Sequence, residues 1–183
     1  MRAIALDALP VLTGERVTLR PITDADTDDI VRWRNTDEVR RNFIFRETFT
    51  PEMHRRWLET KVRTGEVIQY IIEAGEPRRS VGSVYLRDID EKNDSAEYGI
   101  FIGEEDARGQ GFGSETARLF SDFALDTLDL HRLSLRLLAG NDRAKRSYEK
   151  AGFVTEGIFV DMVKLDGAYR SVIFMAKLKE QGR

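Results

Sequence analysis

Seven short segments of the chain are apolar or alternate between apolar and polar residues, and this pattern predicts β-strands. Turn-forming residues separate them: "AGEPRR" joins the second and third, and Asp166-Gly167, a strong hairpin signal, joins the last two. The sequence therefore predicts two hairpins. The first five segments are "RVTLRPI" (16–22), "VIQYIIE" (67–73), "SVGSVYLRD" (80–88), "AEYGIFIG" (96–103) and "RLSLRLLA" (132–139).

Four stretches between these strands have the caps and the apolar periodicity of helices. Thr23 followed by Asp26 is typical of the start of the first helix. The second helix carries His54 among charged residues, so we expect His54 to face solvent. The last three helices are predicted over "TPEMHRRWLETKVRTG" (50–65), "SETARLFSDFALDTL" (114–128) and "NDRAKRSYEKAGF" (141–153).

The order of these elements indicates a mixed α/β fold around one twisted sheet. It runs as one strand, two helices, three strands, a helix, a strand, a helix and two strands. No repeat, low-complexity segment or Gly/Ser/Pro-rich linker divides the 183 residues, a length that suits one hydrophobic core. We therefore expect a single domain over residues 1–183.

The composition is that of an ordinary globular protein. A net charge of −3 gives no basis for nucleic-acid binding, which usually needs a basic surface. The absence of cysteine excludes disulfides, and two widely separated histidines do not suggest a metal site. The opening "MRAIALDALPVL" is too short and too interrupted for a signal peptide or a membrane span. We therefore expect a cytoplasmic protein with no metal, nucleic-acid or membrane partner.

The segment "DARGQGFGSE" (106–115) lies between a predicted strand and a predicted helix and holds three alternating glycines. Free N–H groups at a helix N-terminus attract phosphate, and glycine lets the backbone approach it closely. A dinucleotide fingerprint that starts at Gly109 would need glycine where Ser114 stands, and a P-loop would need a lysine that is absent. The loop therefore suits binding of a pyrophosphate by a motif other than these two, or it is a flexible connection between strand and helix.

A second motif, "NDRAKRSYEKAGF" (141–153), places Asn141 and Tyr148 about two helical turns apart on one face. Together with "RGQGFG" (108–113) it resembles the GNAT superfamily of N-acetyltransferases, and the order of elements along nearly the whole chain also fits. The segments "LRPIT", "EGIFVD" and "DGAYRSVIFMAKL" are most similar to its RimJ/RimL-type and spermidine- or amino-sugar-acetylating branches. The resemblance implies a mostly antiparallel sheet of about six to seven strands with a central parallel pair, flanked by about four helices.

The resemblance implies an enzyme that transfers an acetyl group from acetyl-CoA, its co-substrate, to a primary amine by direct attack on the thioester. The implied acceptor is a polyamine, a nucleotide-linked amino sugar or a protein N-terminus. The resemblance leaves the oligomeric state open between a monomer and a homodimer. Asn141 is implied to hydrogen-bond the pantetheine arm; capping of its helix is the alternative, and one residue can do both. The residues implied to bind the cofactor are Ile100, Phe101 and Ile102 on the strand, Arg108, Gly109, Gln110, Gly111, Phe112, Gly113 and Ser114 in the loop, and Asn141 and Ser147 on the last helix.

Two residues match catalytic positions of the family. Tyr148 is implied to protonate the leaving thiolate, and the alternative is an ordinary half-buried tyrosine on an amphipathic helix. Glu97 is implied as the general base for the amine, and it shares a strand face with Phe101. The alternative for Glu97 is an ion pair with Arg87 or Arg136 on a neighbouring strand.

The acceptor side carries weaker signals. Trp33 and Asn35 lie at the end of the first helix, where the family builds its acceptor pocket, but core packing and helix termination explain them equally well. The acidic run "DIDEKNDSAE" (88–97) is either a rim that attracts a polycationic amine or a solvated turn. Two rival functions are a non-catalytic CoA or acyl-CoA sensor on the same fold and a nucleotide-binding enzyme, which fails on the register of the loop.

Overall fold

The computed structural model describes residues 9–44 and 46–180. Its strands are β1 (Leu12–Thr13), β2 (Val17–Pro21), β3 (Ile68–Ala74), β4 (Arg79–Asp90), β5 (Ser95–Ile102), β6 (Arg132–Leu138), β7 (Val154–Leu165) and β8 (Ala168–Leu178). Its helices are α1 (Thr27–Arg34), α2 (Asp37–Arg40), α3 (Pro51–Trp57), α4 (Phe112–Asp122) and α5 (Asp142–Lys150). A 3-10 turn, η2 (Asp24–Asp26), precedes α1, and π-helical turns continue α3 as η3 (Leu58–Val62) and α4 as η4 (Phe123–Thr127).

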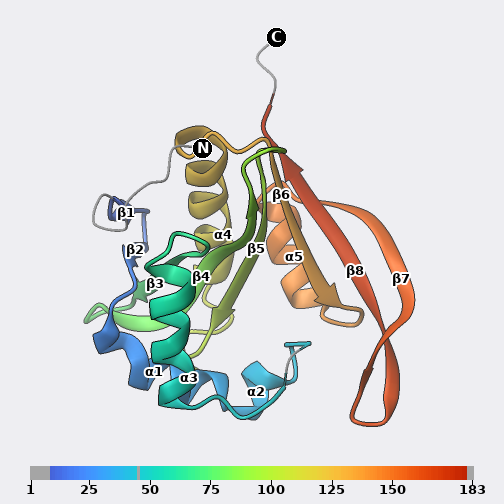
Figure 1. The fold of residues 1–183 in the computed structure, drawn as a ribbon, viewed down its shortest axis with the longest axis horizontal. Helices are drawn as coiled ribbons and strands as arrows, with labels where there is room; N and C mark the ends of the chain where they lie inside the picture. Colours follow the sequence, from blue (N-terminus) through green and yellow to red (C-terminus); the bar gives the residue numbers. More distant parts are fainter. Residues whose placement is uncertain (1–8, 45, 181–183) are drawn as a thin grey trace.

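The strands form one sheet in the order β1-β2-β3-β4-β5-β6-β8-β7 (Figure 1). Every neighbouring pair is antiparallel except β5 and β6, which are parallel. The predicted mixed α/β fold with a central parallel pair is therefore confirmed. The sequence analysis missed β1, which has two residues, and α2, which has four, because elements this short show no periodicity.

Helices cover both faces of the sheet and divide the core into two main clusters (Figure 1). On one face α4, α5 and the strands bury an aromatic group around Phe120, whose ring contacts Tyr70, Tyr98 and Phe123. On the other face α1, α2 and α3 bury Trp33 with apolar residues of β3 and β5. None of the helices in the described parts of the chain is both long enough and apolar enough to cross a membrane.

The helix predicted over 50–65 is present as α3 and η3, but the expectation for His54 is wrong. The side chain of His54 is only 1% exposed, and its Nδ1 lies 3.0 Å from the hydroxyl of Thr27 on α1. Arg55 and Arg56 occupy the solvent face of the helix, so His54 falls on the face that packs against α1. Burial lowers the pKa of His54 to about 4, so the ring is neutral at physiological pH.

Candidate active site

The site begins where the sheet splits between its two parallel strands. β5 and β6 pair over only three residues of each, and the last pair joins Glu97 to Ser134. Beyond that point β5 remains paired with β4 as far as Ile102, and β6 with β8 as far as Leu138. The two strands therefore diverge, as Figure 1 shows, and the facing edge of β5 has peptide groups free to pair with an extended molecule.

A cleft of about 1490 Å³ opens at this split. β5 contributes Ile100 and Ile102 to its wall, and α5 contributes Ser147 and Tyr148. The glycine loop closes one end of the cleft, while α1, α3 and β4 line the other. The structure thus brings most of the predicted cofactor residues to one concave surface.

The glycine loop has the geometry of an anion-binding helix start. Gly109 and Gly111 have φ of 80° and 89°, and Gly111 is the N-terminal cap of α4. The backbone N–H groups of Gly109, Gln110 and Gly111 have no hydrogen-bond partner among the described residues. A Cβ built on Gly109 would touch nothing within 4 Å, so the loop backbone is open to a ligand. Donors and the positive end of a helix therefore point to the same place.

The side chains of the loop behave differently from its backbone. Arg108 lines the cleft, but its Nε donates to the carbonyl of Ile102 at 3.1 Å and its Nη2 to that of Gly103 at 2.6 Å. The side chain of Gln110 donates back to the carbonyl of Asp106, and the ring of Phe112 is buried. Gln110 and Phe112, both predicted to bind the cofactor, therefore do not line the cleft, in contrast to Gly109, Gly111, Gly113 and Ser114.

Helix α5 presents Tyr148 to the cleft from a well-anchored position. Asn141 accepts a hydrogen bond from the N–H of Ala144 at 3.2 Å, which confirms its role as the cap. The ring of Tyr148 packs edge-on against Tyr98, with centroids 6.0 Å apart, and burial raises the pKa of its phenol. Among the described residues its hydroxyl has no hydrogen-bond partner. Ser114 and Ser147, whose Oγ atoms are 2.7 Å apart, join α4 to α5 beside it.

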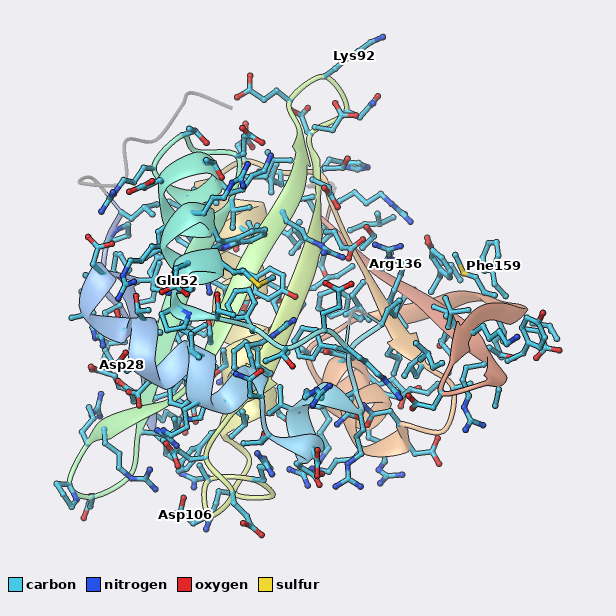
Figure 2. The ribbon with its side chains drawn as sticks, turned by 60° about the horizontal axis from the view of Figure 1, so that its bottom comes forward. Asp28, Glu52, Lys92, Asp106, Arg136 and Phe159 are labelled. Carbon is cyan, nitrogen blue, oxygen red and sulfur yellow. The ribbon has the colours of Figure 1, made fainter. Side chains whose placement is uncertain are left out.

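Glu97 lies at the end of the β5–β6 pairing, with both carboxylate oxygens in ion pairs. Oε1 accepts from Nε of Arg87 at 3.1 Å and also from Nη2 of the same residue, and Oε2 lies 2.7 Å from Nη2 of Arg136. Figure 2 shows Arg136 on β6, between the β4–β5 strands and the β7–β8 ribbon. The ion-pair alternative for Glu97 is therefore present in the structure, and its role as general base stays a prediction.

Neither predicted acceptor residue lines the cleft. The side chain of Trp33 is 0% exposed, and its Nε1 donates to Glu104 at 2.8 Å, so it belongs to the core. Asn35 holds the backbone of Phe49 through two hydrogen bonds, from its Nδ2 to the carbonyl and from the N–H to its Oδ1. The expectation of direct substrate contact is wrong for Trp33, because a fully covered ring cannot touch a ligand. Asn35 instead positions the segment that precedes α3.

The acidic run (88–97) does not form an acidic rim around the cleft. Asp90 accepts hydrogen bonds from the N–H groups of Lys92 and Asn93 and so forms the β4–β5 turn, at the end of β5 opposite the glycine loop. Figure 2 shows Lys92 at the outer tip of this turn. Of the five carboxylates in the run, only Glu97 lines the cleft. The run is therefore a solvated turn.

Sequence reasoning missed two residues on this side of the cleft, Tyr85 and Arg34. The ring of Tyr85 lies so close over Gly99 that a Cβ there would approach it within 2.3 Å. Glycine in the middle of a strand signals such a close approach, so Gly99 could have revealed Tyr85. Arg34 ends α1, and its guanidinium lies 3.8 Å from the ring centre of Phe43. No sequence pattern connects these two positions.

With this geometry established, comparisons with known proteins identify the family. Residues 16–154, well over half of the chain, match the family described as Acetyltransferase (GNAT) domain. The chain belongs to this GNAT family. The family resemblance drawn from the two motifs is thus confirmed, and so is the enzyme class, an N-acetyltransferase.

Several GNAT relatives align over much of their length. A putative ribosomal N-acetyltransferase of Bacillus subtilis is 26% identical over 75% of this chain and 70% of its own. A spermidine N-acetyltransferase of Escherichia coli is 27% identical over 92% and 89% respectively. The crystal structure of a Vibrio cholerae spermidine N-acetyltransferase with CoA and spermine covers 91% of this chain and 97% of its own, at 24% identity and a TM-score of 0.83. The last comparison shows that the GNAT fold is shared.

In the parts of the chain that the structure describes, no group of three His, Cys, Asp or Glu residues is arranged to hold a metal.

Proposed function

We propose that this GNAT protein transfers the acetyl group of acetyl-CoA to a primary amine by direct attack of the amine on the thioester. One observation carries the proposal: a single cleft joins the open edge of β5, the unpaired N–H groups of the glycine loop and the side chain of Tyr148. The names of the relatives, which include ribosomal and spermidine N-acetyltransferases, support an amine acceptor. A polyamine, a nucleotide-linked amino sugar and a protein N-terminus all have the required chemistry.

The chain has a suitable place for each part of the cofactor. The N–H groups of Gly109, Gln110 and Gly111, at the N-terminus of α4, would hold the pyrophosphate, because glycine lets the backbone approach it closely; the N–H of Ser114 already donates to the carbonyl of Gly111. The main chain of Ile100, Phe101 and Ile102 would pair with the pantetheine amides along the open edge of β5. Acetyl-CoA itself would supply the activated thioester. The cationic residues of α5 that line this end of the cleft are Arg143, Arg146 and Lys150.

Tyr148 would act as the general acid. A thiolate leaves more easily when it is protonated, since its ordinary pKa is about 8.5. The phenol of Tyr148 keeps its proton at neutral pH because burial raises its pKa, and its hydroxyl has no competing partner among the described residues. An N–H group of β5 would stabilise the oxyanion that forms when the amine attacks.

Glu97 is proposed as the general base that takes a proton from the ammonium group of the acceptor, so that the neutral amine can attack the thioester. Its side chain is 17% exposed and lines the cleft, so an acceptor can reach it. Its lone pairs face Arg87 and Arg136, so proton transfer requires one of these ion pairs to open. A chain of water molecules that leads to solvent is the alternative route for the proton.

The proposal is tested by release of free CoA thiol in the presence of acetyl-CoA and a panel of primary amines. Turnover with at least one amine, and a mass increase of that amine by one acetyl group, is the expected result. The rival function, a CoA or acyl-CoA sensor, predicts tight cofactor binding with no thiol release for any amine. Calorimetric titration with CoA alone separates the sensor from a protein that does not bind the cofactor.

We also propose that the chain forms a homodimer through the β7–β8 ribbon. β7 is the outermost strand of the sheet, so its outer edge is free to pair, and Figure 2 shows Phe159 on the side of the molecule away from Asp28. Exposed apolar side chains on this ribbon support an interface. Light scattering should give twice the mass of 21.0 kDa, and a monomer mass would contradict the proposal. The exposed apolar residues are Val154, Ile158, Phe159, Val160, Met162 and Tyr169.

A further inference from the structure

The cleft has a charge opposite to that of the whole chain. The protein carries a formal net charge of −3, yet twelve arginine and lysine side chains line the cleft against two carboxylates, Glu38 and Glu97. Both carboxylates are already paired, Glu38 with Arg41 and Glu97 with Arg87 and Arg136. A polycationic acceptor would therefore meet cations in this cleft and find no unpaired carboxylate among the described residues.

The phosphates of the cofactor account for only part of this positive charge. The cations of α5 and the glycine loop lie at the end of the cleft assigned to the cofactor. Toward the other end, Arg46 pairs with Asp166, Lys61 with Glu66, and Arg87 also approaches Asp88 at 3.6 Å. Three cations toward that end have no acidic partner in residues 9–44 and 46–180. They are Arg34, Arg56 and Arg170.

Arg34 differs from the other two because it is half-buried, whereas Arg56 and Arg170 are exposed. Its guanidinium stacks 3.8 Å from the ring centre of Phe43 and 5.4 Å from that of Phe49. The guanidinium makes no hydrogen bond to any described residue. Burial, together with the charge of Arg87, lowers its pKa, although Tyr85 opposes this shift. A half-buried guanidinium without an anion is costly, and a ligand that supplies the anion recovers that cost.

The surroundings of Arg34 suit recognition of a planar or tetrahedral anion. Two phenylalanine rings lie against the guanidinium, which restricts its position and leaves its N–H groups without protein acceptors. A guanidinium held in this way can bind carboxylate or phosphate through two parallel hydrogen bonds. Arg87 and Arg136 line the same cleft, and their two positive charges exceed the single negative charge of Glu97, with which both pair.

We propose that the acceptor amine carries a carboxylate or phosphate group, that Arg34 binds this anion, and that the enzyme discriminates against polyamines. This proposal rests on the proposed function, because it assumes that the amine enters the cleft from the side of α1. It narrows the acceptor to a small anionic amine, such as an amino acid or a phosphorylated amino sugar. The anion would bind at Arg34 while the amine reaches toward Tyr148.

The test measures binding to the CoA-loaded protein by calorimetry, with acceptor pairs that differ only in the anion. Glucosamine 6-phosphate is compared with glucosamine for the phosphate, and leucine with leucinamide for the carboxylate; spermidine represents the polyamines. We expect at least about tenfold tighter binding of one anionic member than of its partner, and weaker binding of spermidine. Arg34→Gln should abolish the preference, and Arg34→Lys should retain part of it because lysine keeps the charge without the two-pronged geometry.

Arg55→Gln is the matched control, since Arg55 is an exposed arginine of α3 that does not line the cleft. It should leave the preference unchanged, and unaltered CoA affinity in all variants shows that the fold is intact. Equal binding within both pairs, tightest binding of spermidine, or a preference that survives Arg34→Gln would overturn the proposal. An anion preference that depends on Arg34 but comes with no acetyl transfer supports the anion site and contradicts the proposed function, so the two failures are distinguishable.

Discussion

The two ends of the cleft differ in the groups that line them: one end offers mainly backbone and the other mainly side chains. At the end that we assign to the cofactor, the proposed binding groups are peptide N–H groups, those of a glycine loop and the open edge of β5. At the end that we assign to the acceptor they are side chains from α1, α3, β4, β5 and β6, and four of these are arginines: Arg34, Arg56, Arg87 and Arg136. A site made of backbone needs a short, contiguous sequence, whereas a site made of side chains is assembled from distant positions. Variants at the two ends should therefore fail in different ways.

Tyr148→Phe should produce the largest effect, at the point where the two ends meet. Loss of the general acid should lower kcat by about 10²- to 10³-fold and leave the Kd for acetyl-CoA nearly unchanged. Steady-state kinetics and calorimetry measure the two quantities. Tyr98→Phe is the control, because the Tyr98 hydroxyl is buried without a partner among the described residues. Full activity of Tyr148→Phe would remove Tyr148 from the mechanism.

Gly111→Val should damage the cofactor end specifically. The positive φ of Gly111 is unfavourable for a branched residue, and a side chain there would crowd the N–H groups that we assign to the pyrophosphate. We expect the Kd for acetyl-CoA to rise roughly 10- to 100-fold by calorimetry. Gly65→Val has a similar φ of 80° with nothing nearby, so it should lose stability but keep cofactor affinity. Normal affinity in Gly111→Val would contradict the loop assignment.

Glu97→Gln sharpens the description of the acceptor end. If Glu97 is the base, kcat should fall about tenfold near pH 7, and the loss should shrink as the pH rises, because more of the amine then arrives deprotonated. A pH series of kcat and KM measures this. Glu38→Gln is the matched control, since Glu38 is the other cleft carboxylate paired with an arginine. A loss that is independent of pH and confined to KM would leave Glu97 only its ion-pair role.

His54→Gln should give the smallest effect, and it should change the thermal stability of the protein and not its catalytic activity. The pKa of His54 falls from 6.5 to about 4 on folding, so the unfolded chain binds the extra proton between these values. Stability linked to His54 is therefore complete above pH 6.5 and is lost as the pH falls toward 4. The wild type should lose a few degrees of Tm more than His54→Gln between pH 7 and 5, as measured by calorimetry. Equal losses would show that His54 titrates normally.

The sequence predicted the cofactor end far better than the acceptor end, and the contrast in construction explains why. The glycines, Asn141 and Tyr148 fall in two short segments, and the resemblance of these two motifs to the family implied that they share one site. Arg34 and Tyr85 are separated by many residues and meet only through packing of α1 on the sheet. Even Gly99, which makes room for Tyr85, indicates a close approach without naming the partner.

The fold followed from periodicity wherever an element was long enough to show it. All seven predicted strands and four predicted helices are present. The failures have local physical causes. Trp33 and His54 each lie on a helix that also carries charged residues, so the sequence does not show whether their side chains face solvent. Both are buried because α1 and α3 pack against each other and against the sheet. Burial of this kind depends on tertiary neighbours that a single helix cannot reveal.

The short parallel pairing of β5 and β6 has a consequence for the lifetime of the protein. In the part of the chain that the structure describes, three residue pairs between β5 and β6 join the two halves of the sheet. A cofactor that lies along the open edge would complete this seam and add its binding energy to the folding energy, about 2.7 kcal/mol at 100 times its Kd. A cell that runs short of the cofactor would then hold a catalyst that is idle and also more easily degraded.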